Sequence, residues 1–187
     1  IETITTELIL SDLDSLRRQM PKLEKDAKRG DKEAAAKFAL AQKLEPHLDA
    51  GKPAITFELE EEEQPIAKSL FLLTAKPTIF AANVQDGDLA TADSNPHVET
   101  VRAYGREHHG CETVVISAQI ESELADLDED EAREFLADLG VEESGVGLLI
   151  RAAYHLLGLR TYFTCGPKET RAWTIHIGDT APQAAGV

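Results

Sequence analysis

Two short apolar stretches, each ending in small polar residues, constrain the fold of this chain more than any other feature. The first covers residues 78–82 (TIFAA) and the second covers residues 112–118 (ETVVISA). Short runs rich in β-branched and aromatic residues favour buried strands. Because helical patterns alternate with these runs, the sequence predicts an α/β fold in which the strands are parallel and helices cover the sheet.

Polar residues follow both predicted strands. Asn83, Val84, Gln85 and Asp86 come after the first, and Ser117 and Ala118 end the second. Parallel sheets bind ligands in the loops at the carboxyl ends of their strands. The Asn83 amide both donates and accepts hydrogen bonds, and the Asp86 carboxylate can accept two hydrogens from a purine edge. The motif predicts a purine-reading loop, with an ordinary surface turn as the alternative.

Residues 11–52 are predicted to form two antiparallel helices of the coiled-coil type. Apolar residues recur at steps of three and four in both halves, namely Ile9, Leu13, Leu16, Met20, Leu23 and Ala27, then Ala34, Phe38, Ala41, Leu44 and Leu48. Gly30 suits the position after a helix end, Asp31 suits the cap of the next helix, and Gly51 ends the second helix. Pro21 removes a backbone donor inside the first helix, so we expect a kink there.

Charge is distributed unevenly along the chain. Residues 11–52 contain ten Lys or Arg and eight Asp or Glu, so this segment is +2 while the rest of a chain of net charge −15 is −17. On the solvent face of the first helix, four basic residues follow spacings of four, three and four: Arg18, Lys22, Lys25 and Arg29. Such a line suits salt-dependent phosphate contacts. The alternative is a solvated helix exterior.

Further helices and strands are predicted beyond the hairpin. Helical patterns cover residues 59–73, 96–108, 126–138 and 144–157. Asn95 and Pro96 suit the cap and first position of the second of these. One side of the last helix is expected to pack on the sheet through Val146, Leu149, Ile150, Ala153 and Leu157. Strands follow from Arg160, and Phe163 and Trp173 are expected to be core residues.

Composition limits the class of protein. No stretch approaches the roughly 18 apolar residues of a membrane helix and no signal-peptide pattern is present, so we expect no membrane partner. Two cysteines, Cys111 and Cys165, are too few for a disulfide framework and favour a reducing compartment. His108, His109 and Cys111 lie close together in the sequence, but no second ligand pair follows, so no metal site is predicted.

Long segments of the chain resemble the YchF (Obg-like ATPase) family of P-loop nucleotide hydrolases. The most specific are ESG at residues 143–145, IRAAYHLLGLRTYFT at 150–164 and KETRAWTI at 168–175. The resemblance implies part of an Obg-type G domain with an inserted helical hairpin and the start of a β-rich TGS domain. It implies four segments: residues 1–10 end a preceding G-domain segment, 11–52 form the hairpin, 53–158 continue the G domain and 159–187 begin the TGS domain.

The resemblance also implies a function. Family members bind and hydrolyse ATP with Mg²⁺ and are associated with ribosomes, so we expect ATP, ribosomes or RNA as partners and a cytoplasmic location. Asn83 and Val84 are carried over as adenine contacts, Asp86 as a third residue of the loop, and Ser117 and Ala118 as the supporting turn. The family usually has Glu at the last position of an NxxE motif, where this chain has the shorter Asp86. Because of this difference, GTP is the alternative nucleotide.

No GxxxxGK[ST] phosphate loop occurs in this sequence. In such a loop, backbone amides and a Lys hold the phosphates, while a hydroxyl and carboxylates hold magnesium. We therefore expect the chain to be an internal portion of a longer ATPase, unable to hydrolyse nucleotide alone, and no catalytic residues are assigned. The alternative function is a non-catalytic module that binds RNA or the ribosome through the basic hairpin and the TGS segment.

Overall fold

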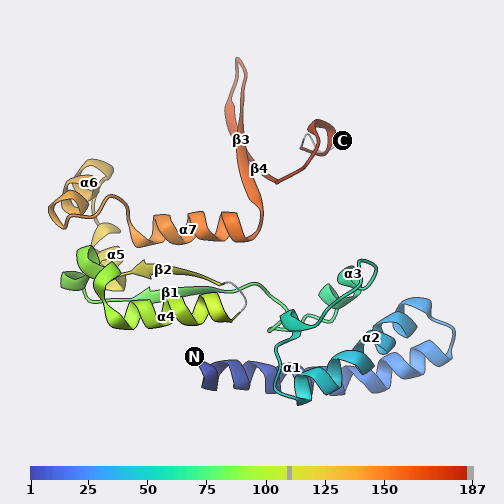
Figure 1. The fold of residues 1–187 in the computed structure, drawn as a ribbon. Coiled ribbons are helices and arrows are strands. Elements are labelled where there is room, and N and C mark those ends of the chain that lie inside the picture. The colour runs from blue at the N-terminus through green and yellow to red at the C-terminus, as the bar shows by residue number, and fades with distance from the viewer. Residues whose placement is uncertain (109–110, 185–187) are drawn as a thin grey trace. The chain divides into compact units, whose positions relative to one another are not determined.

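A computed structural model describes residues 1–108 and 111–184 (Figure 1). The chain forms two compact units, residues 1–77 and residues 78–187. This division differs from the segments expected from the sequence, with boundaries after residues 10, 52 and 158. The difference arises because residues 1–10 begin the first helix and because residues 54–75 contribute to the core of the hairpin unit.

The first unit is built on an antiparallel helical hairpin, formed by α1 (Glu2–Lys28) and α2 (Lys32–Asp49) (Figure 1). The predicted turn is confirmed, since Gly30 has φ +96° and the Asp31 side chain accepts hydrogen bonds from the N–H groups of Glu33 and Ala34 at 2.9 and 3.1 Å. Leucines on the facing sides are almost fully buried: Leu13, Leu16, Leu40, Leu44 and Leu48. Helix α1 continues through Pro21 as one helix.

The segment after the hairpin corrects a prediction. A helix over residues 59–73 was expected, but this segment contains only the short α3 (Gln64–Lys68), preceded by the 3-10 turn η1 (Ala54–Thr56). Residues 61–63 form a turn, with the N–H of Glu63 donating to the carbonyl oxygen of Glu60 at 2.9 Å, so the helix begins only after it. Phe71 ends any continuation because its φ of +55° is left-handed and incompatible with a right-handed helix.

Asp12 attaches this segment to α1. Its carboxylate is buried and accepts three hydrogen bonds of 2.7 Å, from the N–H of Leu73 and from the N–H and hydroxyl of Thr74. The Thr74 hydroxyl oxygen also accepts from the N–H of Ala54 at 2.9 Å. One carboxylate therefore joins the middle of α1 to the last residues of the first unit.

The second unit contains the predicted parallel pair of strands, β1 (Ile79–Asn83) and β2 (Glu112–Ile116). The 3-10 helix η2 (Asp86–Ser94) and helix α4 (Pro96–Glu107) connect them, and Asn95 caps α4 as expected by accepting from the N–H of His97. After β2 come α5 (Ala118–Leu124), α6 (Glu129–Asp138) and α7 (Gly145–Leu156). Asp128 and Glu131 form a capping box at the start of α6.

Helices α4 and α7 cover opposite faces of this small sheet (Figure 1). On one face, a Cβ added to Gly105 of α4 would lie 3.4 Å from both Phe80 and Thr113. On the other face, a Cβ added to Gly145 of α7 would lie 2.8 Å from Ile116. Glycine at these positions lets the helix backbones approach the strands, so the sheet is layered as the α/β prediction required.

The buried side of α7 is not the predicted one. Ala152 and Gly145 are buried, whereas Val146, Ile150 and Leu157 are 46, 54 and 55% exposed. Small residues lie against the sheet because only these permit close contact with β2. A pattern of large apolar residues therefore identified the helix correctly but assigned the wrong face to the sheet.

Two antiparallel strands, β3 (Leu159–Cys165) and β4 (Thr170–His176), confirm the strands expected after Arg160 and are followed by the short α8 (Ala181–Ala184). The expectation that Phe163 and Trp173 lie in a core is wrong, since they are 72 and 40% exposed. A two-stranded ribbon offers too little surface to bury both of its faces. No helix among the described residues has both the length and the apolar character needed to cross a membrane.

Candidate nucleotide-binding site

The loop after β1 and the turn after β2 meet at the carboxyl ends of the strands. Asn83 lies opposite Ile116 in the parallel register. The N–H of Val84 donates to the carbonyl oxygen of Ile116 at 2.9 Å, and Asn83 Oδ1 accepts from the N–H of Ala118 at 2.9 Å. The structure thus brings together Asn83, Val84 and Ala118, which the sequence places 35 residues apart.

Ser117 fixes the second of these two segments. Its side chain is 1% exposed and caps α5, with the hydroxyl oxygen 3.5 Å from the N–H of Ile120. Ile120 is equally buried. Ser117 therefore supports the turn from inside, while Asn83 and Ala118 lie at the exposed rim.

Asp86 is exposed at the start of η2. Its Oδ1 accepts from the N–H of Gly87 at 2.9 Å, a contact within its own loop. Among the hydrogen bonds of the described residues, none joins Asp86 to Asn83 or Ala118. The structure therefore unites four of the five predicted residues and leaves the Asp86 carboxylate beside them in a separate turn.

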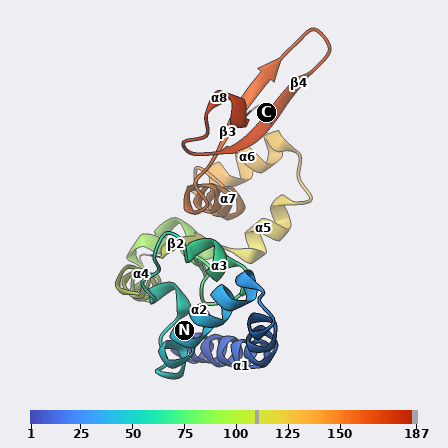
Figure 2. The same ribbon diagram turned by 90° about the vertical axis from the view of Figure 1, so that its right-hand side faces the viewer.

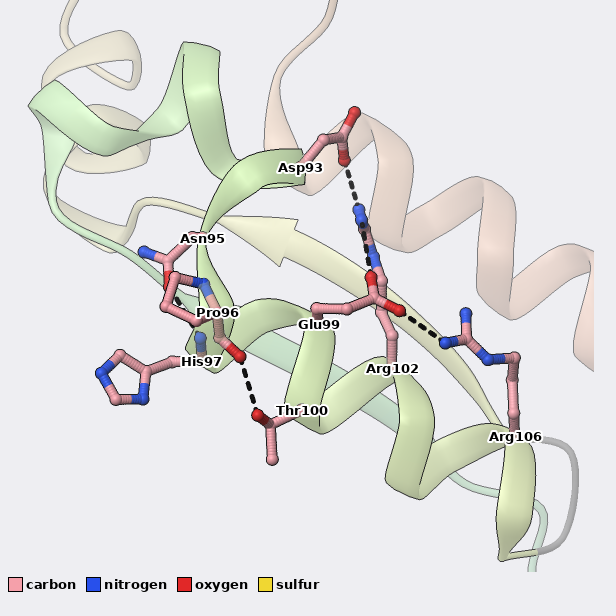
Figure 3. A network of polar contacts seen from close by, with 8 residues as sticks. All are labelled: Asp93, Asn95, Pro96, His97, Glu99, Thr100, Arg102 and Arg106. Carbon is pink, nitrogen blue, oxygen red and sulfur yellow. Dashed lines mark hydrogen bonds and ion pairs between the residues drawn. The ribbon is translucent and has the colours of Figure 1, made fainter.

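An ion pair anchors the segment that follows Asp86 (Figure 3). Arg102 of α4 pairs with Asp93 at the end of η2, with Nη2 and Oδ1 at 2.6 Å. A second pair, Arg106 with Glu99 at 2.6 Å, lies within α4 itself. Asn95 lies between η2 and α4 as the helix cap (Figure 3). The loop that carries Asp86 is consequently tied at its far end to the helix packed on the sheet.

Comparison with known proteins finds relatives along the whole chain. A family model named YchF-GTPase_C, described as a protein of unknown function (DUF933), matches residues 159–187. "Ribosome-binding ATPase YchF" of Bacillus subtilis is 43% identical over the whole chain, which covers 51% of that protein, and its namesake in Pasteurella multocida is 46% identical, with 50% covered. The solved "Structure of the Schizosaccharomyces pombe YchF GTPase" matches 99% of this chain and 50% of that one, with 32% identity and a TM-score of 0.79.

The chain belongs to the YchF family. It spans about half the length of the curated relatives it matches. The recognition made from the motifs is therefore confirmed, and the likeness extends over both compact units of this YchF-family chain.

The predicted basic line lies on the exposed side of α1, but acids accompany it. Arg18 pairs with Asp14 at 3.1 Å and Arg29 with Asp26 at 3.7 Å, and the Arg18 and Arg29 side chains are 73 and 68% exposed. The side chains of the two remaining members, Lys22 and Lys25, have no ion pair among the described residues. The line therefore presents cations to solvent with part of their charge locally balanced.

Two supporting residues were missed by the sequence analysis. The buried Asp12 clamps residues 73–74, and Glu121 of α5 accepts from the N–H of Gly145 at 2.7 Å. Glu121 thereby joins the turn at Ala118 to the start of α7. Neither role leaves a local signal, because the partners are 61 and 24 residues away and an acid in a helix is usually solvated.

No metal centre was predicted from His108, His109 and Cys111, and His109 lies outside the described residues. The His108 ring stacks on Tyr104 with 4.0 Å between centroids. Burial raises the pKa of the Cys111 thiol, against a smaller opposing effect of a backbone hydrogen bond at Thr78. Among the described residues, no group of three or more His, Cys, Asp or Glu is arranged to hold a metal ion.

Proposed function

We propose that this chain supplies the purine-binding end of a P-loop nucleotide hydrolase that prefers ATP, works with Mg²⁺ and binds ribosomes in the cytoplasm. The bond between Asn83 and Ala118 carries the proposal, because it builds one rim from two separate strand ends. The relatives' names support it, although one solved relative is called a GTPase. Hydrolysis requires phosphate-binding residues that this sequence does not contain, so the isolated chain is not expected to catalyse it.

The residues fit the purine end of a nucleotide. Because Asn83 Oδ1 is occupied by Ala118, its amide N–H₂ group is left to donate to a ring nitrogen of the base. Val84 is half-buried beside it and offers an apolar contact for the ring. Ser117 and Ala118 hold the turn. Mg²⁺ would neutralise charge on the phosphates, and we assign no residue of this chain to it.

The contact of Asp86 does not by itself select between adenine and guanine. Guanine recognition by a carboxylate uses both oxygens to accept the two hydrogens of the base edge. In this chain Oδ1 of Asp86 accepts from the N–H of Gly87, and since each carboxylate oxygen has two lone pairs, that bond does not prevent a two-oxygen contact with guanine. The proposed preference for ATP is supported by the relatives that are named as ATPases, and GTP is the alternative.

A test uses fluorescent ATP and GTP analogues with the intact protein that contains this chain. Asn83→Ala removes both the loop contact and the donor, and we expect ATP affinity to fall by about tenfold or more. Asn83→Asp keeps the acceptor for Ala118 but removes the donor. Retention of ATP affinity in Asn83→Asp would mean that Asn83 only holds the loop and does not contact the base.

Asp86→Asn decides between the nucleotides, with Asp88→Asn in the same exposed loop as its charge-matched control. We expect less than about a threefold change in ATP affinity for either variant, since the Asp86 carboxylate is bonded within its own loop and adenine offers it no pair of hydrogens. A large loss of GTP affinity in Asp86→Asn alone, with GTP the tighter ligand of the unchanged protein, would overturn the ATP assignment.

The second candidate function is an RNA or ribosome-binding module. We propose that the α1–α2 hairpin is a coiled coil and that residues 159–187, the range matched by the family model, begin a TGS domain. Charge reversal of the exposed Lys25 together with Arg29 tests it. RNA affinity should fall and the dependence of log Kd on log salt should flatten by about one to two, while unchanged affinity and slope would exclude this surface.

A further inference from the structure

The most acidic part of the chain lies between Ala118 and Glu143. It contains eleven acidic residues and one basic residue, so most of the net charge of −15 is concentrated there. These residues form α5, α6 and the approach to α7, which lie near one another in both views (Figures 1 and 2). The surrounding loops leave this region exposed.

A groove of about 590 Å³ runs between these three helices. Its apolar lining comes from all of them and includes Leu124 of α5, Leu136 of α6 and Val146 of α7. Val146 is 46% exposed. An apolar surface of this kind stays accessible to a partner side chain, because neither the sheet nor another helix of the described part covers it.

The acids at the rim differ in what they already bind. Glu121 accepts from Gly145 N–H, and Glu143 pairs with Arg151 at 2.6 Å. Glu129 and Glu142 also line the groove and are exposed, and their carboxylates make no hydrogen bond or ion pair with the described residues. The charge of Arg133, the basic residue of the lining, is balanced by Asp130 at 3.0 Å. Two uncompensated carboxylates therefore flank an apolar floor.

We propose that this groove binds a basic amphipathic helix of a partner protein. An apolar residue of that helix enters the floor beside Leu136 and Val146, and Lys or Arg one turn away faces Glu129 and Glu142. Helices bind grooves of this kind through apolar anchors, and opposite charge at the rim selects the partner. Nucleic acid is a poor occupant because its phosphates are repelled by the same acids. The site is separate from Asn83 and does not depend on the proposed nucleotide.

The test measures fluorescence anisotropy of a short labelled helical peptide with Leu on one face and Lys on the other. Two further peptides isolate the chemistry, one with Ser in place of Leu and one with Glu in place of Lys. The Lys-Leu peptide should bind, and both altered peptides should bind at least about tenfold more weakly. Equal binding of the Ser-containing peptide would overturn the proposal, since charge attraction alone would then explain it.

Variants of the chain place the binding in the groove. Glu129→Gln combined with Glu142→Gln should weaken the Lys-Leu peptide about fivefold to tenfold at low salt, because both carboxylates face its cations. Glu61→Gln combined with Glu62→Gln, exposed and in the first unit, changes the net charge equally and should weaken it less than about twofold. Equal weakening by the two pairs would mean unspecific attraction to an acidic protein.

A second pair of variants, one test and one control, examines the apolar contact. Val146→Ser should weaken the peptide about threefold to tenfold, whereas Ile150→Ser, an equally exposed residue of α7 outside the groove, should not. Hydrogen exchange should show protection by the peptide within residues 118–146. Protection confined to other segments, or tighter binding of a single-stranded RNA than of the peptide, would refute the proposal.

Discussion

Thr113 of β2 carries a hydroxyl group that is buried without a hydrogen-bond partner among the described residues. Its oxygen lies where α4 approaches the sheet, 3.4 Å from the position that a Cβ on Gly105 would take. Burying an unpaired polar group costs about 1–3 kcal/mol. A threonine in this place therefore lowers the stability of the second unit.

Thr113→Val should raise the free energy of unfolding by roughly 1 kcal/mol, because valine has almost the same shape and no unpaired oxygen. Urea unfolding followed by the fluorescence of Trp173 measures this. Thr100→Val on α4 is the control, since the Thr100 hydroxyl donates to the carbonyl of Pro96 at 2.7 Å and its loss should bring no gain. A Thr113→Val protein no more stable than the unchanged one would show that the hydroxyl is satisfied in solution.

At individual residues, the sequence predicted which residues lie at the site but not the hydrogen bonds that they make. Asn83 and Ser117 each follow a recognisable strand, and parallel strands end at one edge, so their proximity was expected. The donor and acceptor assignment was not predictable, because Asn83 binds the backbone of Ala118 and Asp86 binds Gly87. Hydrogen bonds of this kind depend on backbone positions that no residue pattern encodes.

At the scale of elements, capping residues and periodicity predicted where most helices and strands lie, but they did not predict which side of a helix is buried. Asp31, Asn95 and the strands after Arg160 lie as predicted. The prediction of a single helix over residues 59–73 was wrong because residues 61–63 form a turn and Phe71 has a left-handed backbone conformation, which apolar spacing does not reveal. In α7 the pattern of large residues was right for a helix but wrong for its contact, since glycine and alanine meet the sheet.

The Asp12 carboxylate makes a buried polar link between α1 and residues 73–74 of the first unit. This carboxylate accepts hydrogen bonds from three donors that would otherwise bind water, and these donors belong to Leu73 and Thr74 near the end of the unit. Buried charge satisfied by several hydrogen bonds is costly to disturb, since removing the acceptor leaves all three donors unpaired. The position of residues 72–75 therefore depends on one side chain of α1.

Asp12→Ala should lower the free energy of unfolding of the hairpin unit by about 3 kcal/mol, and Asp12→Asn by less because one acceptor oxygen remains. Urea unfolding followed by circular dichroism at the helix band measures it. Asp14→Ala, which removes an exposed acid paired with Arg18, should change the value by less than about 1 kcal/mol. Equal effects of Asp12→Ala and Asp14→Ala would mean that the buried contacts contribute little.

For the whole molecule, the two compact units carry different cores and different charges. The apolar cluster of the first unit lies within residues 9–75, and the sheet with its two helices lies in the second. By formal charge, residues 1–77 contain twelve basic and fifteen acidic residues and residues 78–187 contain seven and nineteen, which gives −3 and −12. Self-repulsion therefore acts mainly on the second unit.

We expect the two units to unfold in separate transitions, because each has its own core and an independent core supports its own cooperative unfolding. The circular dichroism signal at the helix band comes largely from the hairpin. The fluorescence of Trp173, the single tryptophan, reports on the second unit alone. The urea midpoints of the two signals should differ, and Asp12→Ala should shift the first while leaving the second in place. Added salt should raise the Trp173 midpoint more, since screening relieves the larger charge. Coincident midpoints that move together in Asp12→Ala would show that the chain unfolds as one cooperative unit.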